Sequence, residues 1–464
     1  MAENKKRSIL GELFFRMARA YVGFWHNCFY YKHIHQIGKE NVPAKGTPLI
    51  IASNHQNAVN DALAVEFSFM DRPVSIFTRA DLFSKPVLGS VLRAWHLLPA
   101  FRLGMDGIDS LDKNFDVFKE AGETILDGGS VMIFPEAVNQ DKRWLGEFSQ
   151  GYLRMAFDAA KRDNFETDIQ ILPMANHYSD YFHFREELLV RFGKPISLKP
   201  YYELFQTKPR TVQRKVNAEV RSQISEMMLN ITDLDNYEAI DFVRNTFGGW
   251  YCRSCNGDSS LLPDRLEADK AMFSELQQAR ENGMQDAVDE IYADALALKK
   301  GCVDNNVSVS VFSDGCKPAG VAMWSAALLA GLPLFVVSLV PNILFYLLPK
   351  PVVNKLKSGT SHAAMFIGGV RFALNVIVTI PVFYTAFFVA LGCLAGWVYA
   401  AVHTLCLPFL AVFAWEYRKK FLWVKNKIRF RRLKEGALKP FVGLYNKILN
   451  KLDNILTKNT WKKE

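Results

Sequence analysis

The chain has 464 residues, half of which are apolar, and a formal net charge of +9 at neutral pH. This length allows two or three domains. The charge is uneven, because residues 417–464 hold 15 Lys and Arg against 3 acids, which leaves the remainder near −3. A basic tail beside apolar runs favours anionic lipid over nucleic acid, and the sequence has no zinc-finger, RNA-recognition or helix-turn-helix signature.

The cysteines and the N-terminus indicate the compartment. There are seven cysteines, and the first apolar run is broken by Glu12, Arg16 and Arg19 with no small-residue cleavage site after it. We therefore expect reduced thiols and a cytoplasmic catalytic domain. Cys252 and Cys255 have the spacing of half a zinc site, but no second pair follows at a suitable distance, so we expect no metal.

Residues 1–34 are expected to form interfacial N-terminal helices. Aromatic residues and sparse positive charges recur at roughly helical spacing over residues 8–32. Two interpretations are open for this segment, namely a helix packed on the main domain and a helix lying in the membrane interface.

Strand-like and helix-like stretches alternate over residues 35–230, where we expect the catalytic domain. Such alternation predicts an α/β fold with a largely parallel sheet and flanking helices. The expected strands are 47–53, 74–80, 97–103, 130–137, 169–178 and 187–196, and the expected helices are 61–70, 86–95, 114–129 and 151–163. Ligands bind outside the carboxyl ends of the strands in such sheets. The polar segments 54–61, 101–107 and 135–143 each follow an expected strand, so we expect them to meet at one edge.

Residues 231–317 are polar and helix-rich, and we expect a helical insert or linker domain there. Two apolar runs follow, at 318–349 and 372–415, and neither contains a charged residue apart from the titratable His403. Runs of this length are candidates for a membrane.

The membrane region is expected over residues 318–416. The lysines at 350–357 and the tail are both expected to face the cytoplasm. The first run, which Pro333 and Pro341 interrupt, must then enter and leave on one side. The expected segments are a re-entrant hairpin at 318–349, spans at about 372–390 and 398–415, and a basic amphipathic tail at 417–464. The alternative is three plain spans, which places the tail outside.

His55 and Asp61 are the candidate catalytic residues. A neutral histidine whose second ring nitrogen is held by a carboxylate is well suited to deprotonate a hydroxyl. The sequence has no G-x-S-x-G motif, so no serine nucleophile is indicated. The base would therefore act directly on a substrate hydroxyl.

Four further residues are candidates for binding a substrate phosphate: Arg102, Glu136, Lys142 and Arg143. Arginine suits bidentate binding of a phosphate. Glu136 could orient that arginine or a substrate hydroxyl, and the two basic residues after it add positive charge. Gly151, at the start of an expected helix, would let the backbone come close to a ligand.

The order of these segments resembles the glycerophosphate acyltransferase superfamily, which includes the lysophosphatidic acid acyltransferases. The first two blocks are "NHQNAVND" and "LPAFRLGMDG", and the third begins "IFPEAVNQDKR". The fourth begins "ILPMANHY", and the resemblance covers about residues 35–200. It adds Asn54 and Pro135 as supporting residues beside Gly151.

Three departures from the family pattern stand out. Five residues separate the histidine from the aspartate instead of four, which resembles the branch near glycerol-3-phosphate and dihydroxyacetone-phosphate acyltransferases. Ala137 stands where the family usually has glycine, and its methyl group would narrow the pocket or exclude a positive φ. The arginine block lacks the usual glycine and aspartate around Arg102.

The resemblance implies a membrane-bound acyltransferase for phospholipid synthesis. It would move a fatty acyl group from acyl-CoA or acyl carrier protein to a hydroxyl of glycerol 3-phosphate or a lysophospholipid, without a metal or a cofactor. The expected partners are therefore the lipid bilayer, the thioester donor and this acceptor. Two alternatives stay open: a remodelling transacylase that uses a phospholipid donor, and an inactive lipid-binding protein.

Overall fold

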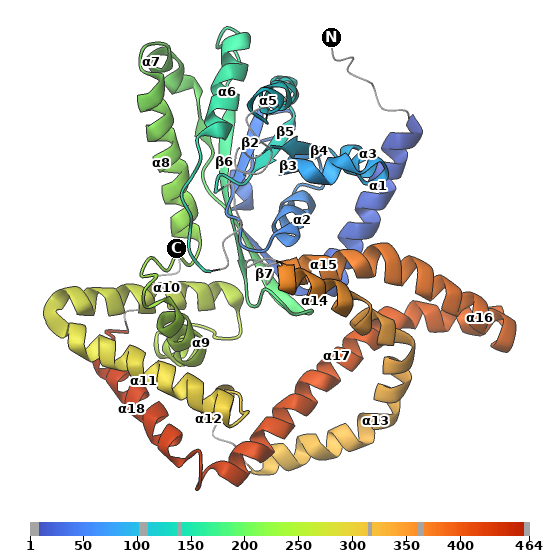
Figure 1. Ribbon diagram of the computed structural model, residues 1–464, viewed down its shortest axis with the longest axis vertical. Coiled ribbons are helices and arrows are strands. Elements are labelled where there is room, and N and C mark those ends of the chain that lie inside the picture. The colour runs from blue at the N-terminus through green and yellow to red at the C-terminus, as the bar shows by residue number, and fades with distance from the viewer. Residues whose placement is uncertain (1–8, 102–109, 137–141, 314–317, 360–365, 459–464) are drawn as a thin grey trace. The chain divides into compact units, whose positions relative to one another are not determined.

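The computed structural model describes residues 9–101, 110–136, 142–313, 318–359 and 366–458 (Figure 1). The chain divides into two compact units. Unit 1 consists of residues 1–230 and 352–376, and unit 2 consists of residues 231–351 and 377–464. The return of residues 352–376 to unit 1 differs from our expectation, which assigned the whole of 318–416 to the membrane region.

Unit 1 has the expected α/β fold. Its eight-stranded sheet has the order β1-β7-β6-β2-β5-β3-β4, with β8 paired to β6. The pairs are parallel except β6 with β7 and β6 with β8. The strands are β1 (Tyr31–Ile37), β2 (Leu49–Ser53), β3 (Val74–Arg79), β4 (Leu97–Ala100), β5 (Ser130–Ile133), β6 (Gln170–Tyr178), β7 (Glu186–Phe192) and β8 (Ile196–Ser197).

Helices cover both faces of this sheet (Figure 1). Ile50 and Ala52 of β2 belong to a core shared with α5, α6 and α8, whereas Leu49 and Ile51 are equally buried and point to the opposite face. The longer helices of unit 1 are α1 (Ile9–Phe24), α2 (Val59–Ser68), α3 (Pro86–Ala94), α5 (Ser110–Leu126), α6 (Gly151–Arg162), α7 (Tyr202–Thr207), α8 (Pro209–Met227) and α15 (Phe366–Leu374). Short helical turns are η2 (Lys39–Asn41), η3 (Ala80–Ser84) and η4 (Lys199–Tyr201).

The N-terminal helix α1 has two different faces. Phe15 and Arg19 are buried, and Arg19 forms an ion pair with Glu66 at 2.5 Å. Its guanidinium also donates to backbone carbonyls at the end of α2. Leu13 and Met17 are exposed. One face is therefore packed on unit 1, and the opposite face presents apolar side chains.

The sheet begins earlier than we expected. After α1 the chain forms a π-helical segment, η1 (Trp25–Tyr30), and then β1, which starts inside the stretch that we expected to be helical. Strand β1 pairs only with β7, so it is an edge strand. Its sequence, "YKHIHQI", is rich in polar residues, and this hid the strand from a reading based on apolar runs.

Unit 2 is helical over its described residues. Its helices are α9 (Tyr237–Ser254), α10 (Leu262–Ala279), η5 (Arg280–Met284), α11 (Gln285–Asp304), α12 (Ser310–Ser313), α13 (Pro318–Leu347), α16 (Thr385–Ala395), α17 (Trp397–Leu433) and α18 (Lys439–Ile455). Two further helices, α14 (Pro349–Gly359) and η7 (Asn375–Tyr384), lie where the chain passes between the units.

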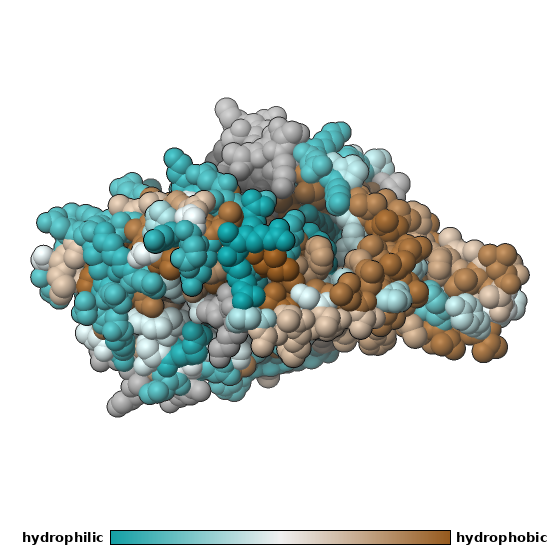
Figure 2. All heavy atoms as spheres, turned by 90° about the horizontal axis from the view of Figure 1, so that it is seen from below, coloured by the Kyte–Doolittle hydropathy of each residue, from teal (hydrophilic) through white to brown (hydrophobic). Residues whose placement is uncertain are grey.

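Three helical segments of the described chain are long and apolar enough to cross a membrane: Pro318–Lys355, Ile367–Ala395 and Trp397–Leu433. Apolar side chains on them, such as Leu329, Leu394 and Val398, are highly exposed. Figure 2 shows hydrophobic surface over the end of the molecule where α16 and the start of α17 project. These surfaces suit a lipid environment.

The first of these segments differs from the expected hairpin. Residues 318–347 form one helix, α13, that contains both Pro333 and Pro341 and bends along its length (Figure 1). A proline removes one helical hydrogen bond and kinks the helix, but neighbouring groups can compensate for that loss. Two prolines inside an apolar run therefore do not require the chain to reverse.

A polar cluster joins three of the apolar helices in unit 2. The side-chain amide of Asn342 in α13 donates to the carbonyl of Leu407 in α17 at 3.3 Å. The hydroxyl of Tyr384 donates to Oδ1 of Asn342 at 2.7 Å. Both side chains are buried. We call Asn342, Tyr384 and the Leu407 carbonyl the amide cluster.

Candidate active site

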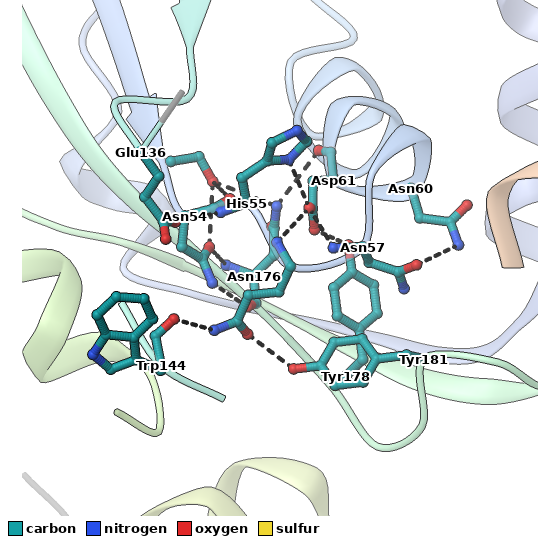
Figure 3. A network of polar contacts seen from close by, with 12 residues as sticks. Asn54, His55, Asn57, Asn60, Asp61, Glu136, Trp144, Asn176, Tyr178 and Tyr181 are labelled. Atoms are coloured by element: carbon teal, nitrogen blue, oxygen red, sulfur yellow. Dashed lines mark hydrogen bonds and ion pairs between the residues drawn. The ribbon is translucent and has the colours of Figure 1, made fainter. Parts of the chain in front are cut away.

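The two residues expected to be catalytic lie close together, His55 in the loop between β2 and α2 and Asp61 in the first turn of α2 (Figure 3). Nδ1 of His55 lies 3.1 Å from Oδ2 of Asp61. The Asp61 side chain has no exposed surface, whereas 15% of the His55 side chain is exposed. The loop therefore joins a buried acid to a histidine that a substrate can reach.

Three further donors hold the Asp61 carboxylate. Oδ2 accepts the backbone N–H groups of Gln56 at 2.8 Å and Asn57 at 2.6 Å. Oδ1 accepts the hydroxyl of Tyr178 at 2.7 Å. These bonds compensate for the water lost on burial and fix the carboxylate toward His55.

A strained turn accommodates the five residues between His55 and Asp61. Ala58 has φ +46° and ψ −116°, a conformation that favours glycine. Across this residue the carbonyl of Asn57 accepts the N–H of Asn60 at 2.9 Å. The turn starts α2 directly afterwards and places Asp61 in its first turn, where the helix dipole favours an acid.

Asn54 connects the loop to the neighbouring strand. Its side-chain nitrogen donates to the carbonyl of Asn176 at 3.0 Å, and its Oδ1 accepts the N–H of Asn176 at 2.8 Å. The side chain thereby extends the pairing of β2 with β6 one residue beyond Ser53, the last paired residue. Asparagine suits this position because its amide has both a donor and an acceptor.

Both carboxylate oxygens of Glu136 accept backbone N–H groups. Its Oε1 accepts the N–H of His55 at 2.8 Å, and its Oε2 accepts the N–H of Gly146 at 2.7 Å. The side chain is buried, and this burial raises the pKa of Glu136 to about 7 against the lowering effect of the two N–H donors. The carboxyl group therefore links the histidine loop to the segment around Gly146.

Phe134 limits the orientation of the histidine ring. The ring centres of His55 and Phe134 lie 3.7 Å apart, and their planes differ by 11°. This stack, together with the bond to Asp61, restricts rotation of the imidazole about its side-chain bonds. The ring is therefore held in one orientation.

Arg143 contacts residues of the same network. It is buried, its guanidinium carbon lies 4.8 Å from the centre of the Tyr181 ring, and it donates to the carbonyl of Tyr178 at 3.2 Å. The Tyr181 hydroxyl donates to Gln56 at 2.8 Å. Arg143 thus contacts residues that surround the Asp61 loop, and its neighbour Lys142 is partly buried.

The remaining candidates are less informative. Pro135 is buried, and its carbonyl accepts the N–H of Ser149 at 2.8 Å. A Cβ on Gly151 would meet only Phe118, at 3.7 Å, so packing does not require glycine there. Arg102 and Ala137 lie outside the described residues. Within the described part of the chain, no group of three or more His, Cys, Asp or Glu side chains could hold a metal ion.

Sequence reasoning missed three residues of this site: Phe134, Asn176 and Tyr178. A signal was present for two of them, because Asn176 and Tyr178 are two residues apart at the end of a mostly apolar strand and so point to the same face. Alternating polar residues at the carboxyl end of a buried strand indicate a site. Phe134 carried no such signal.

Residues 33–177 match the family model described as Acyltransferase. This segment is an acyltransferase domain. The match covers β1 to β6, the histidine loop and Glu136, and the expected relation to the glycerophosphate acyltransferase superfamily is confirmed.

Curated relatives of the acyltransferase domain bear related names. Chloroplastic 1-acyl-sn-glycerol-3-phosphate acyltransferases of Brassica napus and Arabidopsis thaliana are each 27% identical over 119 residues, which are 26% of this chain and 32% and 31% of those proteins. An uncharacterized acyltransferase of Schizosaccharomyces pombe is 25% identical over 126 residues, or 27% of this chain and 18% of that protein. The chain therefore spans about a third or less of the length of these relatives.

Solved structures were also compared with the chain. Among them, a 1-acyl-sn-glycerophosphate (LPA) acyltransferase from Thermotoga maritima matches with a TM-score of 0.30 and 14% identity, covering 48% of this chain and 86% of that one.

Proposed function

We propose that the protein is a membrane-bound O-acyltransferase that transfers a fatty acyl group from a thioester to the hydroxyl of a glycerol-phosphate or lysophospholipid acceptor. The observation that carries the proposal is the His55–Asp61 pair at 3.1 Å, beyond the carboxyl end of β2 and at the start of α2. The names of the curated relatives support the acceptor class.

The chemistry follows from the orientation of the pair. With Nδ1 directed at Asp61, Nε2 of His55 is the basic atom of the ring. It takes the proton from the acceptor hydroxyl as the oxygen attacks the thioester carbonyl. The carbon–sulfur bond then breaks, and the imidazolium returns its proton to the departing sulfur. The products are an ester and a free thiol.

Arg102 is proposed to bind the acceptor phosphate. The support is its sequence position after β4, since the residue lies outside the described chain. Arg102→Ala should raise the KM for a phosphate-bearing acceptor more than the KM for the donor. Equal effects on both constants would remove this role, and no effect on either would indicate an acceptor without a phosphate.

The deciding experiment supplies labelled acyl donors to membranes that contain the protein. Acyl-CoA, acyl carrier protein thioester and a labelled phospholipid are each tested against glycerol 3-phosphate and a panel of lysophospholipids. Ester formation from a thioester supports the proposal. Transfer only from the phospholipid would identify a remodelling transacylase, and transfer from no donor would favour an inactive lipid-binding protein.

The catalytic domain and the basic tail are proposed to face the cytoplasm. In this orientation α13 enters and leaves the membrane on one side, and only the two apolar segments after it cross. The support is the charge of residues 417–464, of which 15 are Lys or Arg, beside the apolar helices. After replacement of the native thiols, Lys357→Cys, Gly396→Cys and Lys434→Cys variants are labelled in intact cells with an impermeant reagent. We expect only the Gly396→Cys variant to react. Labelling of Lys434→Cys from outside would contradict this orientation.

A further inference from the structure

Helix α15 is distant in sequence from the acyltransferase domain but packs on its catalytic loop. It lies beside α2 in unit 1 (Figure 1). The hydroxyl of Tyr30 donates to the carbonyl of Gly368 at 3.0 Å, and Arg371 donates to the carbonyl of Phe182 at 3.0 Å. The buried ring of Phe372 packs 4.9 Å from that of Tyr30. These contacts attach α15 firmly to the domain.

Two adjacent glycines form the surface of α15 that faces the loop. A Cβ on Gly369 would lie 2.9 Å from Cβ of Val59, the first residue of α2. A Cβ on Gly368 would lie 2.7 Å from the carbonyl oxygen of Tyr181 and 3.0 Å from the side-chain nitrogen of Asn60. The contacts at 2.9 Å and 2.7 Å are shorter than real Cβ atoms show, and the contact at 3.0 Å is tighter than most. Only glycine therefore permits this approach.

Glycines reduce the stability of a helix, so two of them in α15 indicate that the close contact is functional. Glycine inside a helix is less favourable than alanine by roughly 0.5–1 kcal/mol. Two in a row in the nine-residue α15 weaken a short helix unless the close contact compensates. The contacted residues, Val59 and Asn60, immediately precede Asp61, so a shift of either would move the carboxylate that orients His55.

We propose that α15 is a positioning element of the active site, in which Gly368 and Gly369 let the helix clamp the start of α2 and so fix Asp61 relative to His55. The proposal rests on the acyl transfer proposed above. Because α15 opens the candidate span Ile367–Ala395, the loop is held by the first residues of an apolar segment that can enter a membrane.

The test compares matched glycine-to-alanine variants in the full-length protein. Gly369→Ala should lower kcat at least tenfold and change the KM of the acyl donor less than twofold. Gly443→Ala in α18 is the control, since a Cβ there meets nothing within 4 Å, and it should keep kcat within twofold. Combining Gly369→Ala with Val59→Gly removes the clashing atom and should restore at least half of the lost activity. An unchanged kcat in Gly369→Ala, or no recovery in the double variant, would overturn the proposal.

A second measurement is independent of acyl transfer. Amide hydrogen exchange of residues 54–61 should be faster in Gly369→Ala than in the wild type, while β2, β5 and β6 stay equally protected. This comparison decides the proposal even if no acyl acceptor is found. If the glycine variant disturbs the whole sheet, Tyr30→Phe removes one clamp bond without adding bulk. Unchanged exchange of the loop in Tyr30→Phe would then contradict the proposal.

Discussion

The two units bury polar groups in different ways. In unit 1 the Asp61 carboxylate is surrounded by backbone N–H groups, a tyrosine hydroxyl and a histidine. In unit 2 the amide cluster contains only neutral groups shared among three helices. A carboxylate needs several donors to be buried, and a loop can supply them, whereas a helix has already used its N–H groups internally. The first network therefore holds one carboxylate against His55, as the proposed reaction requires, and the second connects three helices.

The largest expected difference between the two units is in catalysis, and it is tested by removing His55. His55→Ala should lower kcat at least about a hundredfold, because the general base is lost. Asp61→Asn should act in the same direction, since its amide nitrogen would face the N–H donors of the loop. His33→Ala, an exposed histidine of β1, is the control and should stay within twofold. A rate above about a tenth of wild type in His55→Ala would exclude a general base.

The free energy of unfolding should depend on pH if burial of the Glu136 carboxylate destabilises unit 1. Burial raises the pKa of Glu136 from 4.5 to about 7, so the folded protein holds this proton more tightly than the unfolded chain. The stabilisation is complete below about pH 4.5 and is lost as the pH rises through 7, a change of about 3 kcal/mol. The advantage of wild type over Glu136→Gln in apparent Tm should therefore shrink between pH 5 and pH 8.

The exposed Glu147 provides the control for that measurement, because Glu147→Gln changes a carboxyl group in the same segment without burial. The difference in apparent Tm between Glu147→Gln and wild type should be the same at each pH. A constant difference for Glu136→Gln as well would mean that its two N–H donors keep the carboxyl ionised throughout.

In unit 2, Tyr384→Phe removes one hydrogen bond of the amide cluster. We expect a loss of roughly 0.6–1.7 kcal/mol in helix association, which is the usual range for such bonds between membrane helices. Acyl transfer should stay within twofold. Tyr399→Phe, on an exposed side chain of α17, is the control and should change neither quantity. A tenfold loss of activity in Tyr384→Phe would show that the amide cluster also serves the reaction.

The smallest expected effect concerns the turn at Ala58. Ala58→Gly should raise the free energy of unfolding by up to about 1 kcal/mol, because glycine adopts the positive φ without strain but gains entropy in the unfolded chain. Ala64→Gly, in the interior of α2, should lower it by about the same amount. A loss of stability in both variants would mean that Ala58 carries no strain.

The sequence predicted the parts of this molecule that depend on local pattern. Parallel strands alternate with helices, and the residues at their carboxyl ends converge, so the pairing of His55 with Asp61 was predictable. The partners of Glu136 were not, because its two N–H donors come from segments 81 and 10 residues away, and no local pattern marks them.

Long-range packing limited the prediction in the same way elsewhere. Residues 318–416 were expected to form the membrane region, yet α15 within that range packs on the acyltransferase domain. The two glycines were present in the sequence. Their close contacts are with Tyr181 and Val59. These contacts arise from the tertiary fold and cannot be predicted from spacing along the chain.

Unit 1 is built from two separate parts of the chain, so during synthesis its second part can join only after the first has been made. Tyr30 and Gly368 are 338 residues apart, so the clamp on the catalytic loop cannot close when the sheet has just been completed. At about 5–20 residues per second, the ribosome needs roughly 7–30 s to proceed from residue 230 to residue 376. Translation passes the first apolar helix in that interval. The catalytic loop of a nascent chain thus gains its last support only after the first candidate span has been made.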